Sequence, residues 1–130
     1  MPIAAFYAAF LTPVLVFLTM RTVAGRRSHR VLLGDGGNAD LLQRIRRHGN
    51  FVEYTPYALV LLALAESVGT SPVALHAGGL SLVTGRLLHA FALTPPGGIL
   101  KVRVAGMVLT MAALAILAVA CLIGAFRQMM

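Results

Sequence analysis

The stretch "RIRRHGNFVEYTPYALVLLALAE", residues 44–66, decides the fold. Its second half is apolar enough to lie in lipid, whereas its first half carries three arginines, a histidine, an asparagine and a glutamate. Charged side chains cost little among lipid headgroups and a great deal in hydrocarbon. We therefore expect a helix that starts outside the membrane core and ends within it, with its charged half as a candidate functional site.

The composition of the whole chain indicates a membrane protein. Of its 130 residues, 58% are hydrophobic and 12% are charged, and the mean hydropathy is +0.85. A soluble domain has about a quarter of its residues charged. The net charge of +7 would suggest nucleic acid in a soluble protein, but here the basic residues flank apolar runs. We expect them to meet membrane lipids and anionic ligands, with no nucleic-acid partner.

Apolar runs and turn signals divide the chain into four helices. We predict an all-α membrane protein with one four-helix domain over residues 1–130, whose spans cover about residues 3–22, 48–66, 73–93 and 102–126. "GDGGN" at 34–38 and "TPPGG" at 94–98 are predicted turns. Because Arg21 follows the first run and no positive charge precedes it, we expect a retained span and not a cleaved signal peptide.

The distribution of basic residues predicts the orientation. Seven of them lie between Arg21 and Arg47, and Lys101 and Arg103 come near the start of the last span, whereas residues 67–72 carry none. Arg127 alone follows the last span. The positive-inside rule then places both basic links in the cytoplasm and both termini outside.

One face of the second helix groups the polar residues. Arg46, Asn50 and Glu53 are spaced i, i+4 and i+7, with Tyr54 beside them. A charge at the bilayer centre costs on the order of 3 kcal/mol, so Glu53 must pair inside the bundle or line a watery pocket. Arg86, at a similar depth in the third span, is its natural partner. Two interpretations of Glu53 and Arg86 remain open: they form a structural ion pair, or they belong to an anion-binding site.

A surplus of arginine favours the anion site. Five arginines can gather at one membrane face, with Glu53 as the one buried acid: Arg26, Arg27, Arg46, Arg86 and Arg103. Guanidinium groups in a partly desolvated pocket favour carboxylates or phosphates. The sequence shows no metal-ligand spacing, phosphate loop or nucleophile triad, so any catalysis would activate a bound ligand.

Two further expectations concern packing. The small residues Ala77, Ser81 and Gly85 lie on one stripe with His89 and are expected to press the third helix against a neighbour. Glu66, at the far end of its helix, is expected at the surface.

Four motifs resemble those of one known family. "RRHGNFVEYTP" at 46–56 resembles the second-helix signature of the MAPEG family, the membrane-associated proteins in eicosanoid and glutathione metabolism. "RRSHRV" at 26–31, "GRLLHAFAL" at 85–93 and "VRVAG" at 102–106 resemble parts of its first, third and fourth helices. The motifs come in the family's order, and the third-helix motif resembles especially that of small bacterial members, which implies the bacterial inner membrane.

The resemblance implies a homotrimer that binds glutathione between neighbouring subunits near the cytoplasmic face, without a metal. By similarity, the glutathione backbone is held by Arg46, Asn50, Glu53 and Tyr54. Arg26 or Arg27 would take a carboxylate from the adjoining subunit, and Arg86 would support the pocket. Arg103 would face the sulfur as a catalytic residue. His89, the second catalytic candidate, stands where leukotriene-synthesising members have a tyrosine, as does Leu93.

The family implies a glutathione S-transferase or peroxidase that stabilises the thiolate of its co-substrate glutathione and conjugates it to hydrophobic electrophiles. A non-catalytic lipid- or thiol-binding protein on the same scaffold is the alternative. A small proton-coupled exporter fits less well, because the first helix holds no acid and an exporter has no use for five pocket arginines.

Overall fold

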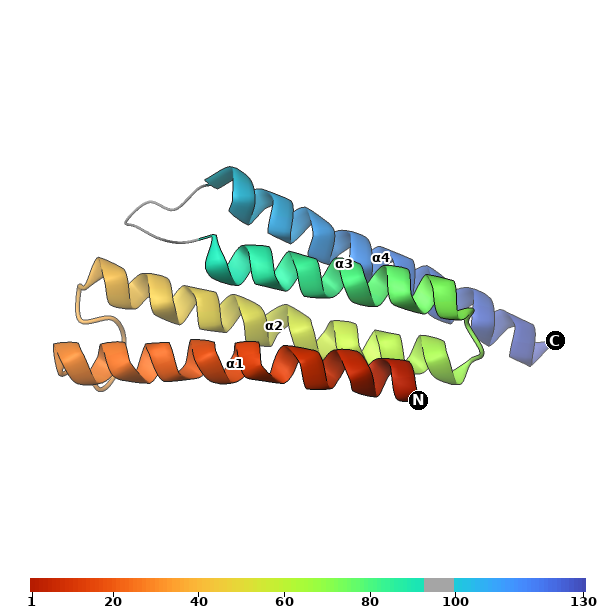
Figure 1. Cartoon of the computed structure of the whole chain (residues 1–130), viewed down its shortest axis with the longest axis horizontal. Helices are drawn as coiled ribbons and strands as arrows, with labels where there is room; N and C mark the ends of the chain where they lie inside the picture. The colour runs from red at the N-terminus through yellow and green to blue at the C-terminus, as the bar shows by residue number, and fades with distance from the viewer. Residues whose placement is uncertain (93–99) are drawn as a thin grey trace.

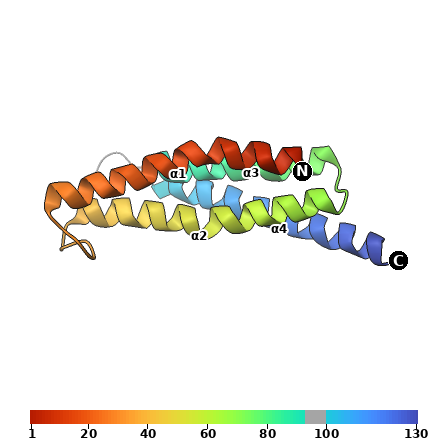
Figure 2. The ribbon, with the colours of Figure 1, turned by 90° about the horizontal axis from the view of Figure 1, so that it is seen from below.

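The chain forms a bundle of four helices. The computed structural model describes residues 1–92 and 100–130, which hold α1 (Pro2–His29), α2 (Ala39–Ser67), α3 (Pro72–Phe91) and α4 (Leu100–Met129) and no strand. The helices lie side by side, with both termini at one end and the α1–α2 turn at the other (Figures 1 and 2). The predicted all-α fold is confirmed, while Leu93 and the predicted 94–98 turn lie outside the described residues.

The helix ends follow local sequence signals. Asn38 caps α2 by accepting a hydrogen bond from the backbone N–H of Leu41 at 2.9 Å, and Ser71 caps α3 in the same way. Pro72 occupies the first turn of α3, where a missing N–H costs nothing. The long second helix therefore begins well before its apolar half, as its charged start predicts.

Small residues draw α3 and α4 together, and their contact is the most extensive in the bundle. A Cβ atom added to Gly106 would lie 2.8 Å from the carbonyl oxygen of Gly85 and 2.8 Å from the backbone nitrogen of His89. Ser81 adds a hydrogen bond from its hydroxyl to the carbonyl of Leu109 at 2.8 Å. The predicted stripe thus packs against α4, although Ala77 itself is exposed.

Helix α2 is central, since it contacts α1, α3 and α4. Helix α3 likewise contacts all the others, whereas α1 and α4 make no mutual contact within the described residues. α1 lies against the α2–α3 side of the bundle, and its Tyr7 is buried over Gly79 of α3. The Tyr7 hydroxyl also lies 3.0 Å from Nδ1 of His76.

Glu66, expected at the surface, is half-exposed and also holds the start of α1. Its carboxylate oxygens accept hydrogen bonds from the backbone N–H groups of Ile3 at 3.1 Å and Ala4 at 2.8 Å. These are among the first N–H groups of α1, which have no acceptor inside the helix. A negative charge is also favourable at the positive end of a helix dipole. Glu66 therefore fixes the start of α1 to the end of α2.

Hydropathy separates the outer helices from the inner ones. Within the described residues, α1 and α4 are each long and apolar enough to cross a membrane. Helices α2 and α3 carry the polar residues of the candidate site, such as Glu53 and Arg86, and fall short of the same measure. That all four helices span the membrane stays a prediction from the sequence.

The close α3–α4 approach predicts a large effect of one added methyl group. We expect Gly106→Ala to lower the free energy of unfolding by about 2–3 kcal/mol, because the new Cβ meets backbone atoms that cannot turn away. Gly49→Ala is the control, since the nearest atom to its Cβ would be Glu53 Oε1 at 4.0 Å. It should leave stability equal or raised by up to about 1 kcal/mol. Thermal unfolding in detergent measures both, and equal midpoints would contradict the packing described here.

Candidate functional site

The most deeply buried charge is the guanidinium of Arg86, which is 1% exposed between α2, α3 and α4. Its Nη1 donates to Asn50 Oδ1 at 2.8 Å, and its Nε donates to Thr110 Oγ1 at 3.0 Å. Nη2 also donates to Thr110 Oγ1, and that hydroxyl donates to the carbonyl of Gly106 at 2.9 Å. Buried charges are normally paired with an opposite charge. Here every hydrogen-bond partner is neutral, so one positive charge stays uncompensated in the middle of the bundle.

The aromatic ring of Tyr54 completes the cage around Arg86. The guanidinium carbon lies 5.7 Å from the ring centroid, which is the range of a cation–π interaction. Tyr54 and Asn50 lie one turn apart on α2, so the second-helix motif holds the arginine of the third-helix motif. Two of the sequence motifs therefore meet in three dimensions.

The Glu53–Arg86 ion pair that the sequence suggested does not form within this chain. Glu53 is exposed, and on α2 it is Asn50 and Tyr54 that contact Arg86. In the part of the chain that the structure describes, the one ion pair joins Arg44 and Asp40 at 2.7 Å. An exposed carboxylate at membrane depth is costly unless another chain or a ligand covers it.

A cationic cavity of about 170 Å³ lies beside this cluster, at the end of the bundle that carries the basic residues. Helix α2 contributes Leu42, Gln43, Arg46 and Arg47 to its lining, α3 contributes His89 and α4 contributes Arg103. His89 is 8% exposed, whereas Arg46 and Arg103 are exposed. Three arginines around one cavity repel each other, so an anion there would be strongly favoured.

Arg47 is the least solvated cation of the cavity. Its Nη2 donates to Gln43 Oε1 at 3.1 Å, while its buried Nε has no hydrogen-bond partner. Burial lowers the pKa of Arg47, and the nearby charge of Arg21 adds to the effect. Both effects mean that an anion bound here would relieve an unfavourable charge.

The structure brings together most of the predicted site residues. Arg46, His89 and Arg103 line the cavity, and Asn50, Tyr54 and Arg86 form the buried cluster.

Arg26 and Arg27 lie elsewhere, at the end of α1. Nη1 of Arg26 donates to the carbonyls of Leu32 at 3.2 Å and Gly34 at 2.9 Å, so this side chain holds the turn of its own chain. Arg27 is exposed. Within one chain, neither of them reaches the cationic cavity.

Sequence reasoning missed two contributors. In the sequence, Arg47 contributes only to the predicted orientation, whereas in the structure it lines the cavity next to Arg46. Thr110 is absent from the sequence prediction. It is the one serine or threonine in α4, and this lone hydroxyl in an apolar helix could have indicated it. A lone polar residue in a lipid-embedded helix usually has a partner in another helix.

The fold and the site define a class: a small, polytopic α-helical membrane protein with an arginine-lined cavity at one end of its bundle. Within this class the chain belongs to the MAPEG family, whose family model matches residues 4–123. The identification made from the four sequence motifs is thereby confirmed.

Two curated proteins are similar to the chain. Inner membrane protein YecN of Escherichia coli strain K12 is 38% identical over 89 residues, which is 68% of each chain. The protein of the same name in Escherichia coli O6:H1 strain CFT073 has the same identity and coverage. No solved structure is similar enough to count as a match. The family and these relatives agree with an integral membrane protein.

The Arg86 cluster predicts that one hydroxyl is essential to stability. Thr110→Val keeps the shape of the side chain but leaves two guanidinium N–H groups unpaired, so we expect a loss of about 1–3 kcal/mol. Thr110→Ser keeps the acceptor oxygen and should lose much less. Unfolding in detergent compares the two variants, and equal stability would show that the hydroxyl does not support the arginine.

Proposed function

We propose that this protein is a membrane-bound enzyme of the glutathione S-transferase or peroxidase type, which stabilises the glutathione thiolate and conjugates it to hydrophobic electrophiles. The observation that carries the proposal is the cavity lined by Arg46, Arg47, Arg103 and His89, with no acid among its lining residues. Glutathione offers two carboxylates and a thiol that can ionise, and guanidinium groups bind carboxylates through paired hydrogen bonds. The chemistry of the cavity and of the ligand are therefore complementary.

The charges of the site residues match different charged groups of glutathione. Arg46 and Arg47 suit the carboxylates, and the exposed Glu53 suits the ammonium group of glutathione. The Arg86 cluster keeps Asn50 and Tyr54 in place, and the charge of Arg86 adds to the positive potential of the cavity. In an assembly, Arg26 or Arg27 of a neighbouring copy would supply a further cation.

Arg103 and His89 suit the thiol. A free thiol has a pKa of about 8.5, and lowering it by two units takes roughly 2.7 kcal/mol of preference for the thiolate. Arg103 is exposed in one chain, and a guanidinium beside the thiol would supply an effect of that size once bound glutathione and a neighbouring copy exclude water from the cavity. His89 lies in the same cavity and accepts the thiol proton when neutral. The thiolate then attacks an electrophilic carbon of a substrate from the lipid, and as the carbon–sulfur bond forms, the bond from that carbon to the leaving group breaks and the leaving group departs as an anion.

Two exposed charges on α2 support an assembly of several copies. Glu53 and Arg46 are both exposed on α2, and an unpaired charge at membrane depth needs cover. We propose that copies of the chain cover this face in a homotrimer. The basic end would face the cytoplasm and both termini the other side, in a bacterial inner membrane.

Non-catalytic lipid binding is the second candidate. A mostly apolar cavity of about 740 Å³ lies at the opposite end of the bundle, between the α2–α3 turn and α4. It could hold a lipid without any contribution from the arginine cavity. A thiol that binds without ionising would also favour a binding role.

The decisive test is the ionisation of bound glutathione. We expect thiolate absorbance and proton release on titration of the detergent-purified protein with glutathione. Arg103→Ala should raise the apparent thiol pKa by about one to two units while binding persists. Lys101→Ala is the matched control. This exposed cation lies two residues before Arg103 in α4 but does not line the cavity.

Either of two results would overturn the enzyme proposal. If glutathione binds to the wild type without ionising, the binding role is the better description. If glutathione does not bind, the arginine cavity holds another anion.

A further inference from the structure

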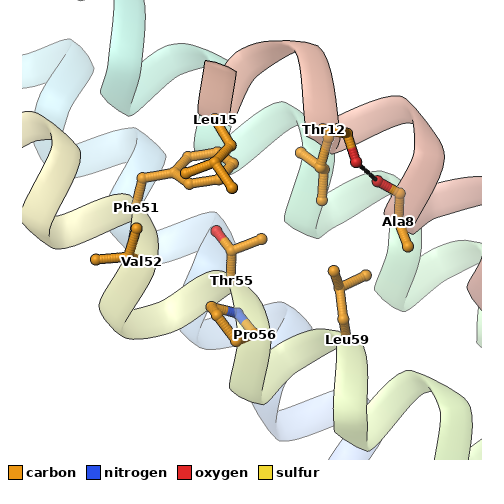
Figure 3. Close-up of a pocket in the computed structure, with 9 residues that line it drawn as sticks. Ala8, Thr12, Leu15, Phe51, Val52, Thr55, Pro56 and Leu59 are labelled. Carbon is orange, nitrogen blue, oxygen red and sulfur yellow. Dashed lines mark hydrogen bonds between the residues drawn. The ribbon is translucent and has the colours of Figure 1, made fainter. Parts of the chain in front are cut away.

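The interface between α1 and α2 holds two pockets that differ in polarity. The larger has a volume of about 100 Å³, and its lining is apolar apart from Thr12 and Thr55, as Figure 3 shows. The smaller has a volume of about 10 Å³ and lies nearer the end of α1 and the start of α2. We call it the triple-arginine pocket, because it is lined by one leucine and three arginines: Leu18, Arg21, Arg44 and Arg47.

Arg44 forms a fixed wall of the triple-arginine pocket. Its Nη1 donates to the backbone carbonyl of Arg21 in α1 at 3.3 Å, and its Nη2 contacts the carboxylate of Asp40 at 2.7 Å. Gly25 of α1 leaves room for this side chain, since a Cβ atom there would lie 3.1 Å from Cδ of Arg44. These contacts hold the guanidinium of Arg44 between the two helices.

Two N–H groups on the residues of this pocket have no acceptor. In the part of the chain that the structure describes, three buried side-chain nitrogen or oxygen atoms lack a hydrogen-bond partner, and two of them are Nε of Arg44 and Nε of Arg47. A buried donor that stays unpaired is costly, and more so on a charged group. Two such donors on residues that line one pocket point to an acceptor held there.

The pocket also carries an excess of positive charge. Among the described residues, Asp40 is the one carboxylate that pairs with any of its three arginines, so two of the three charges have no counterion. Burial lowers the pKa of Arg47, and the charges of Arg21 and, more weakly, of Arg44 lower it further. An anion among these side chains would relieve the repulsion.

The size and the hydrogen-bonding groups of the pocket restrict the ligand. A volume of about 10 Å³ holds one water-sized particle, so a carboxylate, a phosphate or glutathione is too large. Arginine side chains donate hydrogen bonds and accept none, so a water molecule would find no side-chain acceptor for its own O–H groups. A halide ion only accepts. The pocket lies at the edge of the predicted spans 3–22 and 48–66, where a halide can enter from water.

We propose that the triple-arginine pocket binds one chloride ion, which accepts hydrogen bonds from Nε of Arg44 and Nε of Arg47 and lies beside the guanidinium of Arg21. The ion joins the end of α1 to the start of α2 and offsets the repulsion among the arginines. Arg47 is the one residue that lines both this pocket and the cationic cavity. The proposal therefore holds whether or not the protein binds glutathione.

The test is whether the thermal stability of the protein depends on chloride in a saturable way. The purified full-length protein is melted in a neutral detergent while chloride replaces gluconate at constant ionic strength. At about ten times its dissociation constant, chloride should raise the melting midpoint by about 3–6 °C. Bromide should have the same effect, because it is also a monatomic acceptor.

Arg21→Gln removes one of the three charges. The guanidinium of Arg21 lies 5.8 Å from the ring centroid of Phe17, and the change breaks no hydrogen bond between described residues. The variant should lose the chloride response and melt at least as high as the wild type in gluconate, because less repulsion is left. If Arg21 were merely structural, the variant would melt lower in both salts and keep the response.

Two control variants should keep the chloride response. Arg30→Gln changes an exposed arginine at the end of the same helix, outside the pocket. Arg103→Ala changes the cationic cavity without touching the triple-arginine pocket, so it tells the two sites apart.

Bromide locates the ion directly and needs no variant. Crystals grown with bromide should show an anomalous peak between α1 and α2, beside Arg44 and Arg47. The proposal is wrong if chloride gives no saturable stabilisation, if Arg21→Gln keeps the response, if Arg103→Ala loses it, or if no bromide lies between these two helices.

Discussion

The bundle depends on how it accommodates one buried positive charge. Arg86 has no carboxylate to neutralise it, and α2 and α4 each supply a neutral acceptor, Asn50 and Thr110. Thr110 can reach the guanidinium because α4 approaches α3 closely at Gly106 and Gly85. A neutral cage satisfies the hydrogen bonds of the guanidinium without cancelling its charge. The positive potential of Arg86 therefore extends to the neighbouring cavity. A buried ion pair would have cancelled that potential.

Helix α2 contributes to both the Arg86 cluster and the cationic cavity, with different residues of its charged first half. One side presents Asn50 and Tyr54 to Arg86, and its first turns contribute Arg46 and Arg47 to the cationic cavity. Its apolar half packs on α1, with a small pocket beside Thr55. The polar residues of the candidate site lie mainly on α2 and α3, the two helices that each contact three others, whereas α1 and α4 are the helices apolar enough to cross a membrane.

The fold was predictable from the sequence because its signals are local. Apolar runs, the caps at Asn38 and Ser71, and the basic clusters all act within a few residues. The motifs also predicted most of the site, since Arg46, His89 and Arg103 do meet.

The missed features depend on which side of a helix faces which neighbour. Spacing placed Glu53 on the face of Asn50, yet a rotation of a few tens of degrees decides that Asn50 meets Arg86 and Glu53 does not. Glu66 finds its partners 62 and 63 residues away, at the start of α1. No local pattern signals a contact at that distance.

That last contact bears on biosynthesis. Helix α1 leaves the ribosome before the residue that satisfies its first amides has been made, so until Glu66 arrives Ile3 and Ala4 must be hydrated. The start of α1 is thus held at the aqueous boundary while α2 is still being translated. Glu66 replaces that water once α2 lies beside α1, so the cap of the first helix forms only with the α1–α2 hairpin.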